Sequence, residues 1–86
     1  MPFLAEMAGK VLKSRKKLAK ALGKRIRSLR TKKGLSLKHF EAKGNSIDRH
    51  SLSDIENGKK IPNLYTLYRI SAVLEVPLED FVSNLK

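Results

Sequence analysis

Residues 46–58 read SIDRHSLSDIENG, and this stretch has the signals of a short helix at both ends. Asp48 is a good N-cap, because its carboxylate can accept hydrogen bonds from the free N–H groups of the first turn. The glycine that closes the stretch suits the left-handed residue that often follows a helix. Leu52 and Ile55 fall on one face. The pattern therefore predicts a helix over 48–57 whose polar N-terminal end points outward.

A long helix is expected before this stretch. Residues 3–33 are rich in Ala, Leu, Lys and Arg and contain no proline. One apolar stripe runs along the segment and contains Leu4, Ala8, Val11, Leu18, Leu22, Ile26 and Leu29. Gly23 interrupts the stripe and costs about 1 kcal/mol relative to alanine. Three arrangements fit this pattern: one continuous helix, a kinked helix, or an arm followed by a helix that begins near Leu22.

Further short helices are expected on either side of the 48–57 helix. Ser36 is the expected N-cap of a helix that runs to about Lys43, and Asn63 is the expected N-cap of another. The helix after Asn63 has an apolar stripe formed by Leu64, Leu67, Ile70, Val73 and Leu74. Pro77 suits the first turn of a last helix, whose buried side would contain Leu78, Phe81, Val82 and Leu85. No segment has the alternation of a strand, so the predicted fold class is all-α.

The net charge of +11 is concentrated in the first part of the chain. Residues 1–34 contain 12 basic side chains and one acidic side chain, whereas residues 35–86 contain seven of each. A basic block beside a neutral globular part indicates a polyanionic partner, which is either nucleic acid or an anionic membrane. The alternative is that the lysines only keep a helix soluble.

Several classes of function are excluded by what the sequence lacks. The absence of cysteine excludes disulfides, zinc–thiolate sites and thiol catalysis. His39 and His50 have no second ligand at metal-binding spacing, and the serines have no matching base and acid. We therefore expect no enzyme, no metal and no cofactor. No apolar run is long enough to span a membrane, and the N-terminus lacks a signal-peptide pattern. We expect a cytoplasmic protein that is nucleoid-associated when bound.

From Leu22 to Phe81 the chain resembles the Cro and lambda-repressor-like helix-turn-helix proteins of bacteria and phages. The matching positions, in the order of the family, are Leu22-Gly23, Ile26, Leu29, Arg30, Gly34-Leu35-Ser36, Phe40, Ile47, Leu52-Ser53, Ile55-Glu56, Gly58, Pro62, Leu67, Ile70, Leu74 and Val76. The resemblance implies a lambda-repressor-like five-helix DNA-binding domain over residues 22–86. Residues 1–21 would then be a basic amphipathic extension, either helical or an arm.

The sequence departs from the family pattern in the turn before the 48–57 helix. Between Phe40 and Ile47 there is one residue more than the usual spacing. Either Glu41 or Ala42 then takes the position of the small residue that lets two helices approach. Ala42 is the expected one, because a buried glutamate would need a partner. Leu37 stands where many members have a glutamine that contacts a phosphate.

The resemblance also implies the residues that contact DNA. The 48–57 helix would enter the major groove with its N-terminal residues at the base edges. The implied base contacts come from Arg49, His50, Ser51 and Asp54. Arg49 comes first, because a guanidinium can pair with guanine O6 and N7. The expected phosphate contacts come from Ser36, Lys38, Lys59, Lys60 and Asn63. Arg30 and Glu56 are expected to form a structural ion pair between the first and third helices.

These observations predict a sequence-specific transcriptional regulator, a repressor, that binds double-stranded DNA as a homodimer and binds no membrane. The dimer surface would be the N-terminal helix or residues 77–86. One alternative is an antitoxin-type protein-interaction module that also binds its own promoter. Another is a cationic helix protein that binds a membrane surface.

Overall fold

The computed structural model describes the main chain of residues 2–43 and 47–82 and the side chains of residues 14–43 and 47–81. Within these residues the chain forms five helices: α1 (Pro2–Lys32), α2 (Leu37–Ala42), α3 (Arg49–Glu56), α4 (Leu64–Leu74) and α5 (Glu79–Val82). The described residues contain no strand. The predicted all-α, five-helix architecture is therefore confirmed.

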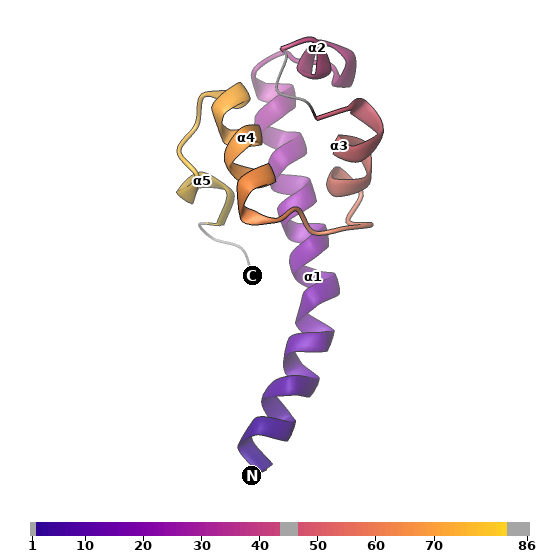
Figure 1. Ribbon diagram of the computed structural model, residues 1–86, viewed down its shortest axis with the longest axis vertical. Coiled ribbons are helices and arrows are strands. Elements are labelled where there is room, and N and C mark those ends of the chain that lie inside the picture. Colours follow the sequence, from indigo (N-terminus) through magenta and orange to yellow (C-terminus); the bar gives the residue numbers. More distant parts are fainter. Residues whose placement is uncertain (1, 44–46, 83–86) are drawn as a thin grey trace.

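Helix α1 gives the molecule its shape. It contains 31 residues, which corresponds to about 46 Å at 1.5 Å per residue. Its N-terminal half projects from the bundle formed by the other helices (Figure 1), so the molecule measures 49 × 22 × 19 Å. Of the three arrangements that the sequence allowed, the structure has the continuous helix, which runs through Gly23. The division into residues 1–21 and 22–86 stays a prediction.

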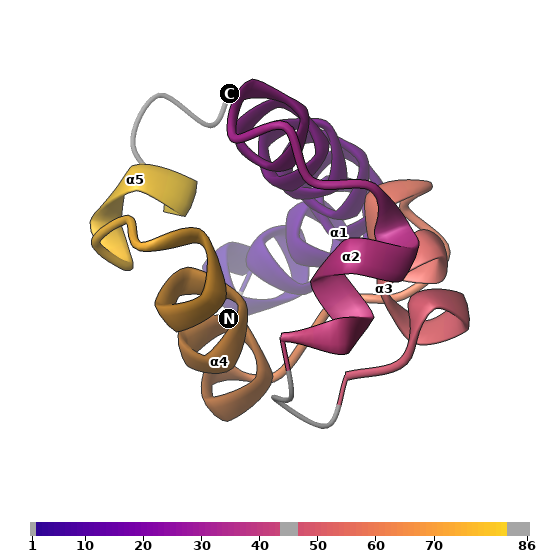
Figure 2. The ribbon, with the colours of Figure 1, turned by 90° about the horizontal axis from the view of Figure 1, so that it is seen from above.

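The core lies where α1 meets the other helices. In the view of Figure 1, α4 and α3 flank the packed part of α1 on the left and the right, and α2 lies across the top of the bundle; Figure 2 shows the same helices from above. The buried apolar cluster contains Leu22, Ile26, Phe40, Ile47, Leu52, Ile55, Leu67, Ile70, Leu74 and Phe81. The cluster draws on all five helices, so α3 is fixed to the same core as α1 and α4.

Among the described side chains, the predicted stripe on α1 is buried or half-buried from Leu22 onward. Leu22 and Ile26 are buried and Leu29 is half-buried, but Leu18 is 45% exposed. Ala19 is buried at this level instead of Leu18, because its side chain faces the chain segment at Gly58. The side chains of Leu4, Ala8 and Val11 lie outside the described residues.

The local signals at the helix ends are largely confirmed. Ser36 Oγ accepts a hydrogen bond from the His39 N–H at 3.1 Å. Asp48 Oδ1 accepts from the Ser51 N–H at 2.6 Å, and Asn63 Oδ1 accepts from the Thr66 N–H at 2.7 Å. All three predicted N-caps therefore cap helices. The glycines after α1 and α3, at positions 34 and 58, have φ of +73° and +74° as the sequence indicated.

Two details of the last helices differ from the prediction. Leu64 is 70% exposed, because it lies in the first turn of α4 on the side away from the core. Helix α5 begins at Glu79 rather than at Pro77, and the Pro77 carbonyl accepts a hydrogen bond from the Asp80 N–H at 3.0 Å. Phe81 is buried as predicted. The predicted Val82 and Leu85 contacts lie outside the described side chains.

Candidate nucleic-acid interface

The C-terminal end of α3 is held against α1 at Gly23. A Cβ atom added to Gly23 would lie 2.4 Å from the Ile55 carbonyl oxygen and 2.5 Å from the Glu56 carbonyl oxygen. These atoms belong to the backbone and cannot move aside without shifting the helix. From the sequence, Gly23 was expected only to lower the stability of α1 relative to alanine. The structure shows that glycine is needed there because the two helices are in backbone contact.

A buried ion pair joins the same two helices about two turns further along α1. Arg30 Nε lies 2.7 Å from Glu56 Oε2, and Arg30 Nη2 lies 2.9 Å from Glu56 Oε1. Arg30 Nη1 also donates to the Leu35 carbonyl at 2.6 Å. Arg27 Nε lies 3.5 Å from Glu56 Oε1 at the exposed edge of the pair. The two-point geometry fixes the orientation of α3 relative to α1.

The N-terminal end of α3 is exposed and is held by acidic side chains. Arg49 and His50 at this end are exposed. Glu41 Oε2 accepts a hydrogen bond from the Arg49 N–H at 2.8 Å. The expectation that Ala42 faces α3 is therefore wrong: Ala42 is exposed and Glu41 faces the helix. The partner that a glutamate needs is the unpaired N–H group at the start of α3, which the sequence reasoning did not consider.

The second acidic side chain at this end is the N-cap itself. The Ser51 backbone N–H and, to a smaller extent, the Ser51 hydroxyl donate to the Asp48 carboxylate and lower its pKa below the ordinary value. The positive charges of His50 and Lys60 act in the same direction but more weakly. Asp48 is exposed. It is therefore ionised at neutral pH and stabilises the positive end of the α3 dipole.

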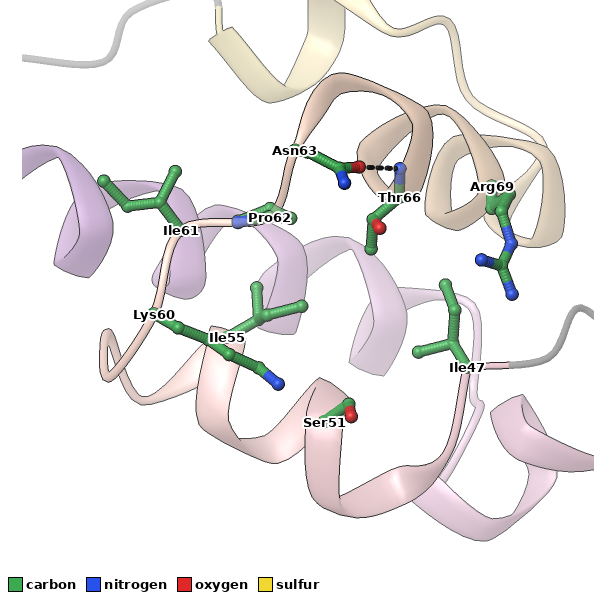
Figure 3. Close-up of a pocket in the computed structure, with 9 residues that line it drawn as sticks. All are labelled: Ile47, Ser51, Ile55, Lys60, Ile61, Pro62, Asn63, Thr66 and Arg69. Carbon is green, nitrogen blue, oxygen red and sulfur yellow. Dashed lines mark hydrogen bonds between the residues drawn. The ribbon is translucent and has the colours of Figure 1, made fainter.

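A groove of about 320 Å³ separates α3 from the start of α4 (Figure 3). Its apolar lining residues are Ile47, Ile55, Ile61 and Pro62. Its polar residues are Ser51, Lys60, Asn63, Thr66 and Arg69. The structure thus brings together three residues that the sequence singled out, from α3, the following loop and the N-cap of α4. Together they give the groove hydroxyl, amide and ammonium groups.

Arg69 is a groove residue that the sequence reasoning missed. Its guanidinium carbon lies 5.3 Å from the centre of the Tyr65 ring, which is within the range of a cation–π contact. The signal that would have found it is its spacing from Asn63 and Thr66, since residues three apart lie on one side of a helix.

The remaining predicted contact residues lie around α3. Lys38 is exposed in the first turn of α2, next to the Ser36 cap, and Lys59 is exposed just after α3. Asp54 is half-buried on α3 itself. Ser36 and Asn63 use one oxygen each as a cap, but the Ser36 hydroxyl and the Asn63 amide NH₂ keep donors for another partner. Leu37 is half-buried and packs against the core, so its side chain has no donor for a phosphate.

Metal binding and membrane crossing would need other features, namely a cluster of ligating side chains and a long apolar helix. That part of the chain contains no group of three His, Cys, Asp or Glu side chains that could hold a metal ion. Over the same residues, no helix combines the length and the apolar character that are needed to cross a membrane.

Comparison with known proteins places this geometry in a family. A comparison with curated proteins gave no match. A family model described as "Helix-turn-helix" matches residues 26–81, which is more than half of the chain. The match begins in the packed half of α1 and ends in α5, and it includes the ion pair, α2, α3 and the groove beside α4. The chain therefore belongs to the helix-turn-helix family HTH_3 of DNA-binding regulators, in agreement with its resemblance to the Cro and lambda-repressor-like proteins.

Proposed function

We propose that this protein is a sequence-specific transcriptional regulator, a repressor, that reads the major groove of DNA with α3. The observation that carries the proposal is the contrast along α3. Its last turn is buried against α1 through Gly23 and Glu56, whereas Arg49 and His50 in its first turn are exposed. A helix held at its C-terminal end with a polar, exposed N-terminal end fits the geometry of a recognition helix.

The base contacts are assigned to the first turns of α3. Arg49 would donate two hydrogen bonds to guanine O6 and N7. His50 and Ser51 have shorter side chains that can donate or accept, and Ser51 lines the groove between α3 and α4. Asp54, one turn after His50, would accept from a cytosine amino group and would repel a misplaced phosphate. These assignments make the protein discriminate between bases mainly through Arg49.

The phosphate contacts are assigned to two places beside α3. Ser36 and Lys38 are at the N-terminus of α2, and Lys59, Lys60 and Asn63 lie between α3 and α4. Contacts of this kind position the protein on the duplex but carry no sequence information. They would supply most of the affinity, and this affinity would fall steeply with salt.

We further propose that the protein binds as a homodimer on two half-sites. The N-terminal half of α1 and the residues from 77 onward were the first candidate surfaces. Helix α4 adds a third, since Leu64, Tyr65 and Tyr68 are each at least 60% exposed. Sedimentation equilibrium of the full chain, with and without Tyr68→Glu, tests this surface. A monomer in both samples would refute the homodimer.

The decisive experiment is selection of binding sites from a random DNA pool. We expect a recurring half-site. Arg49→Ala should reduce discrimination at one base pair by about 1–3 kcal/mol. Lys60→Ala should weaken binding to all duplexes alike and lower the salt dependence. If the selected pool has no common sequence, or if the two variants behave identically, the assignment of a reading helix is wrong.

A further inference from the structure

A second groove lies on the other side of the loop that joins α3 to α4. Its volume is about 370 Å³. It is lined by Arg15, Lys16 and Ala19 of α1 and by the loop from Gly58 to Ile61. Four of its residues are cationic, and none is acidic: Arg15 and Lys16 come from α1, and Lys59 and Lys60 come from the loop. In Figure 1 the loop crosses α1 just where the projecting half of the helix begins.

The loop can approach α1 closely because the side chains are small where the two segments meet. A Cβ atom on Gly58 would lie 2.9 Å from Lys20 Cγ and 3.1 Å from Lys20 Cα, so glycine lets the loop approach the helix backbone. The φ of +74° at Gly58 also favours glycine. Ala19 is buried beside it. This close approach places four exposed cationic side chains around one cavity, and a bound anion would reduce their mutual repulsion.

This groove is continuous with the proposed reading surface. Lys60 and Ile61 line both it and the groove that contains Ser51 and Asn63. A duplex that met α3 and the loop would therefore have Arg15 and Lys16 next to its backbone. Both residues lie outside the part of the chain that the family model matches, which begins at residue 26. They are an addition to the shared domain.

We infer that the groove between α1 and the α3–α4 loop binds the phosphodiester backbone of DNA outside the base pairs that α3 reads. The inference rests on the proposed function and deepens it, because it assigns Arg15 and Lys16 to a second row of phosphate contacts. DNA is favoured over an anionic membrane because half of the groove's cations belong to the loop beside α3. The contacts lengthen the footprint and raise the salt dependence, but they leave the choice of bases unchanged.

The test compares the full-length protein with Arg15→Ala/Lys16→Ala and with the single variants Lys16→Ala and Lys17→Ala. Lys17 is exposed and adjacent in α1 but does not line the groove, so Lys17→Ala is a control for one lost charge. The probes are a duplex that ends at the selected site and one that continues for about one helical turn, roughly 10 base pairs, on each side. Circular dichroism checks that α1 stays helical in each variant.

We expect the wild-type protein to bind the longer duplex more tightly. The double variant should lose this preference and should lower the slope of log K against log salt by about 2, at about 0.9 per phosphate. Lys16→Ala should lower it by about 1, and Lys17→Ala should change neither the slope nor the preference. Base discrimination should be the same in all four proteins.

Each other outcome contradicts a defined claim. If the double variant kept the wild-type slope and preference and still recognised the selected half-site, the assignment of the groove to the DNA backbone would be wrong. The proposed function would be unaffected. The same loss in Lys17→Ala as in Lys16→Ala would also overturn the assignment of the groove, because general charge would then explain the effect. If the double variant lost binding to vesicles that contain phosphatidylglycerol but bound DNA like the wild type, the groove would be assigned to membranes. The inference of a DNA-backbone site would then be overturned. Failure of the wild type to select any sequence refutes the proposed function before a variant is compared.

Discussion

The two ends of α3 are held in opposite ways. The C-terminal end is buried against α1: Glu56 is paired with Arg30, and at Gly23 the two backbones are in contact. The N-terminal end carries exposed Arg49 and His50 and is held by two surface carboxylates, Asp48 and Glu41. Removing one partner of a buried ion pair costs several kcal/mol, because the other charge is left unpaired, whereas removing one partner of an exposed pair costs little. Stability and recognition should therefore be separable along a single helix of eight residues.

The largest effect is expected at the buried ion pair. Glu56→Ala should lower the free energy of unfolding by about 3–5 kcal/mol, because Arg30 is left as a buried, unpaired cation. Urea unfolding measures it. Arg27→Ala is the matched control at the exposed edge of the pair and should cost less than about 1 kcal/mol. If the two variants were equally stable, the C-terminal end of α3 would not be fixed by the buried pair.

The next effect is expected at Gly23. In an open helix Gly→Ala is stabilising by about 1 kcal/mol, but here the new Cβ meets the backbone of Ile55 and Glu56. We expect Gly23→Ala to destabilise by about 1–3 kcal/mol and to weaken DNA binding, because α3 must shift. Ser28→Ala, at an exposed site of the same helix, should be neutral or slightly stabilising. A stabilising Gly23→Ala would mean that α1 and α3 are not in backbone contact.

A smaller effect is expected at Glu41. Glu41→Ala should cost about 0.3–1 kcal/mol, the range for a charge at a helix end, and should speed hydrogen exchange of the Arg49 amide. Glu41→Gln keeps an oxygen acceptor and should retain most of the protection. Ala42→Gln should change neither quantity, because Ala42 is exposed. Strong destabilisation by Ala42→Gln would restore the original expectation that Ala42 packs between α2 and α3.

The smallest effect is expected at Asp48 and depends on pH. Its pKa is lower in the folded protein than the ordinary 3.8, so the folded state favours the ionised form. The resulting stabilisation is fully present above pH 3.8 and is lost as the pH falls through the lowered folded pKa. The difference in unfolding free energy between wild type and Asp48→Asn should therefore shrink in acid. A difference that is constant with pH would exclude a charge effect at the cap.

Local features were predictable because they depend on neighbours within one or two turns. The caps at Ser36, Asp48 and Asn63 follow from side-chain chemistry next to an apolar periodicity. The stripe of α4 was predicted apart from Leu64, whose position in the first turn takes it beyond the core. The resemblance, rather than the pattern of residues alone, supplied the expected partnership of Arg30 with Glu56. Which residue of the longer turn faces α3 was predicted wrongly, because burial was weighed without the free N–H groups of the next helix.

The sequence by itself determined the helices, their caps, the position of the basic block and the family. It did so because these features depend on residue type and short spacing. Only the tertiary structure decided what Gly23 is for, that Glu41 holds the start of α3, and that Arg15 and Lys16 share a groove with Lys59 and Lys60. Each of these joins different structural elements, and two of them join segments more than 30 residues apart. Such contacts are set by how closely packed helices approach, and that distance has no signature in local spacing.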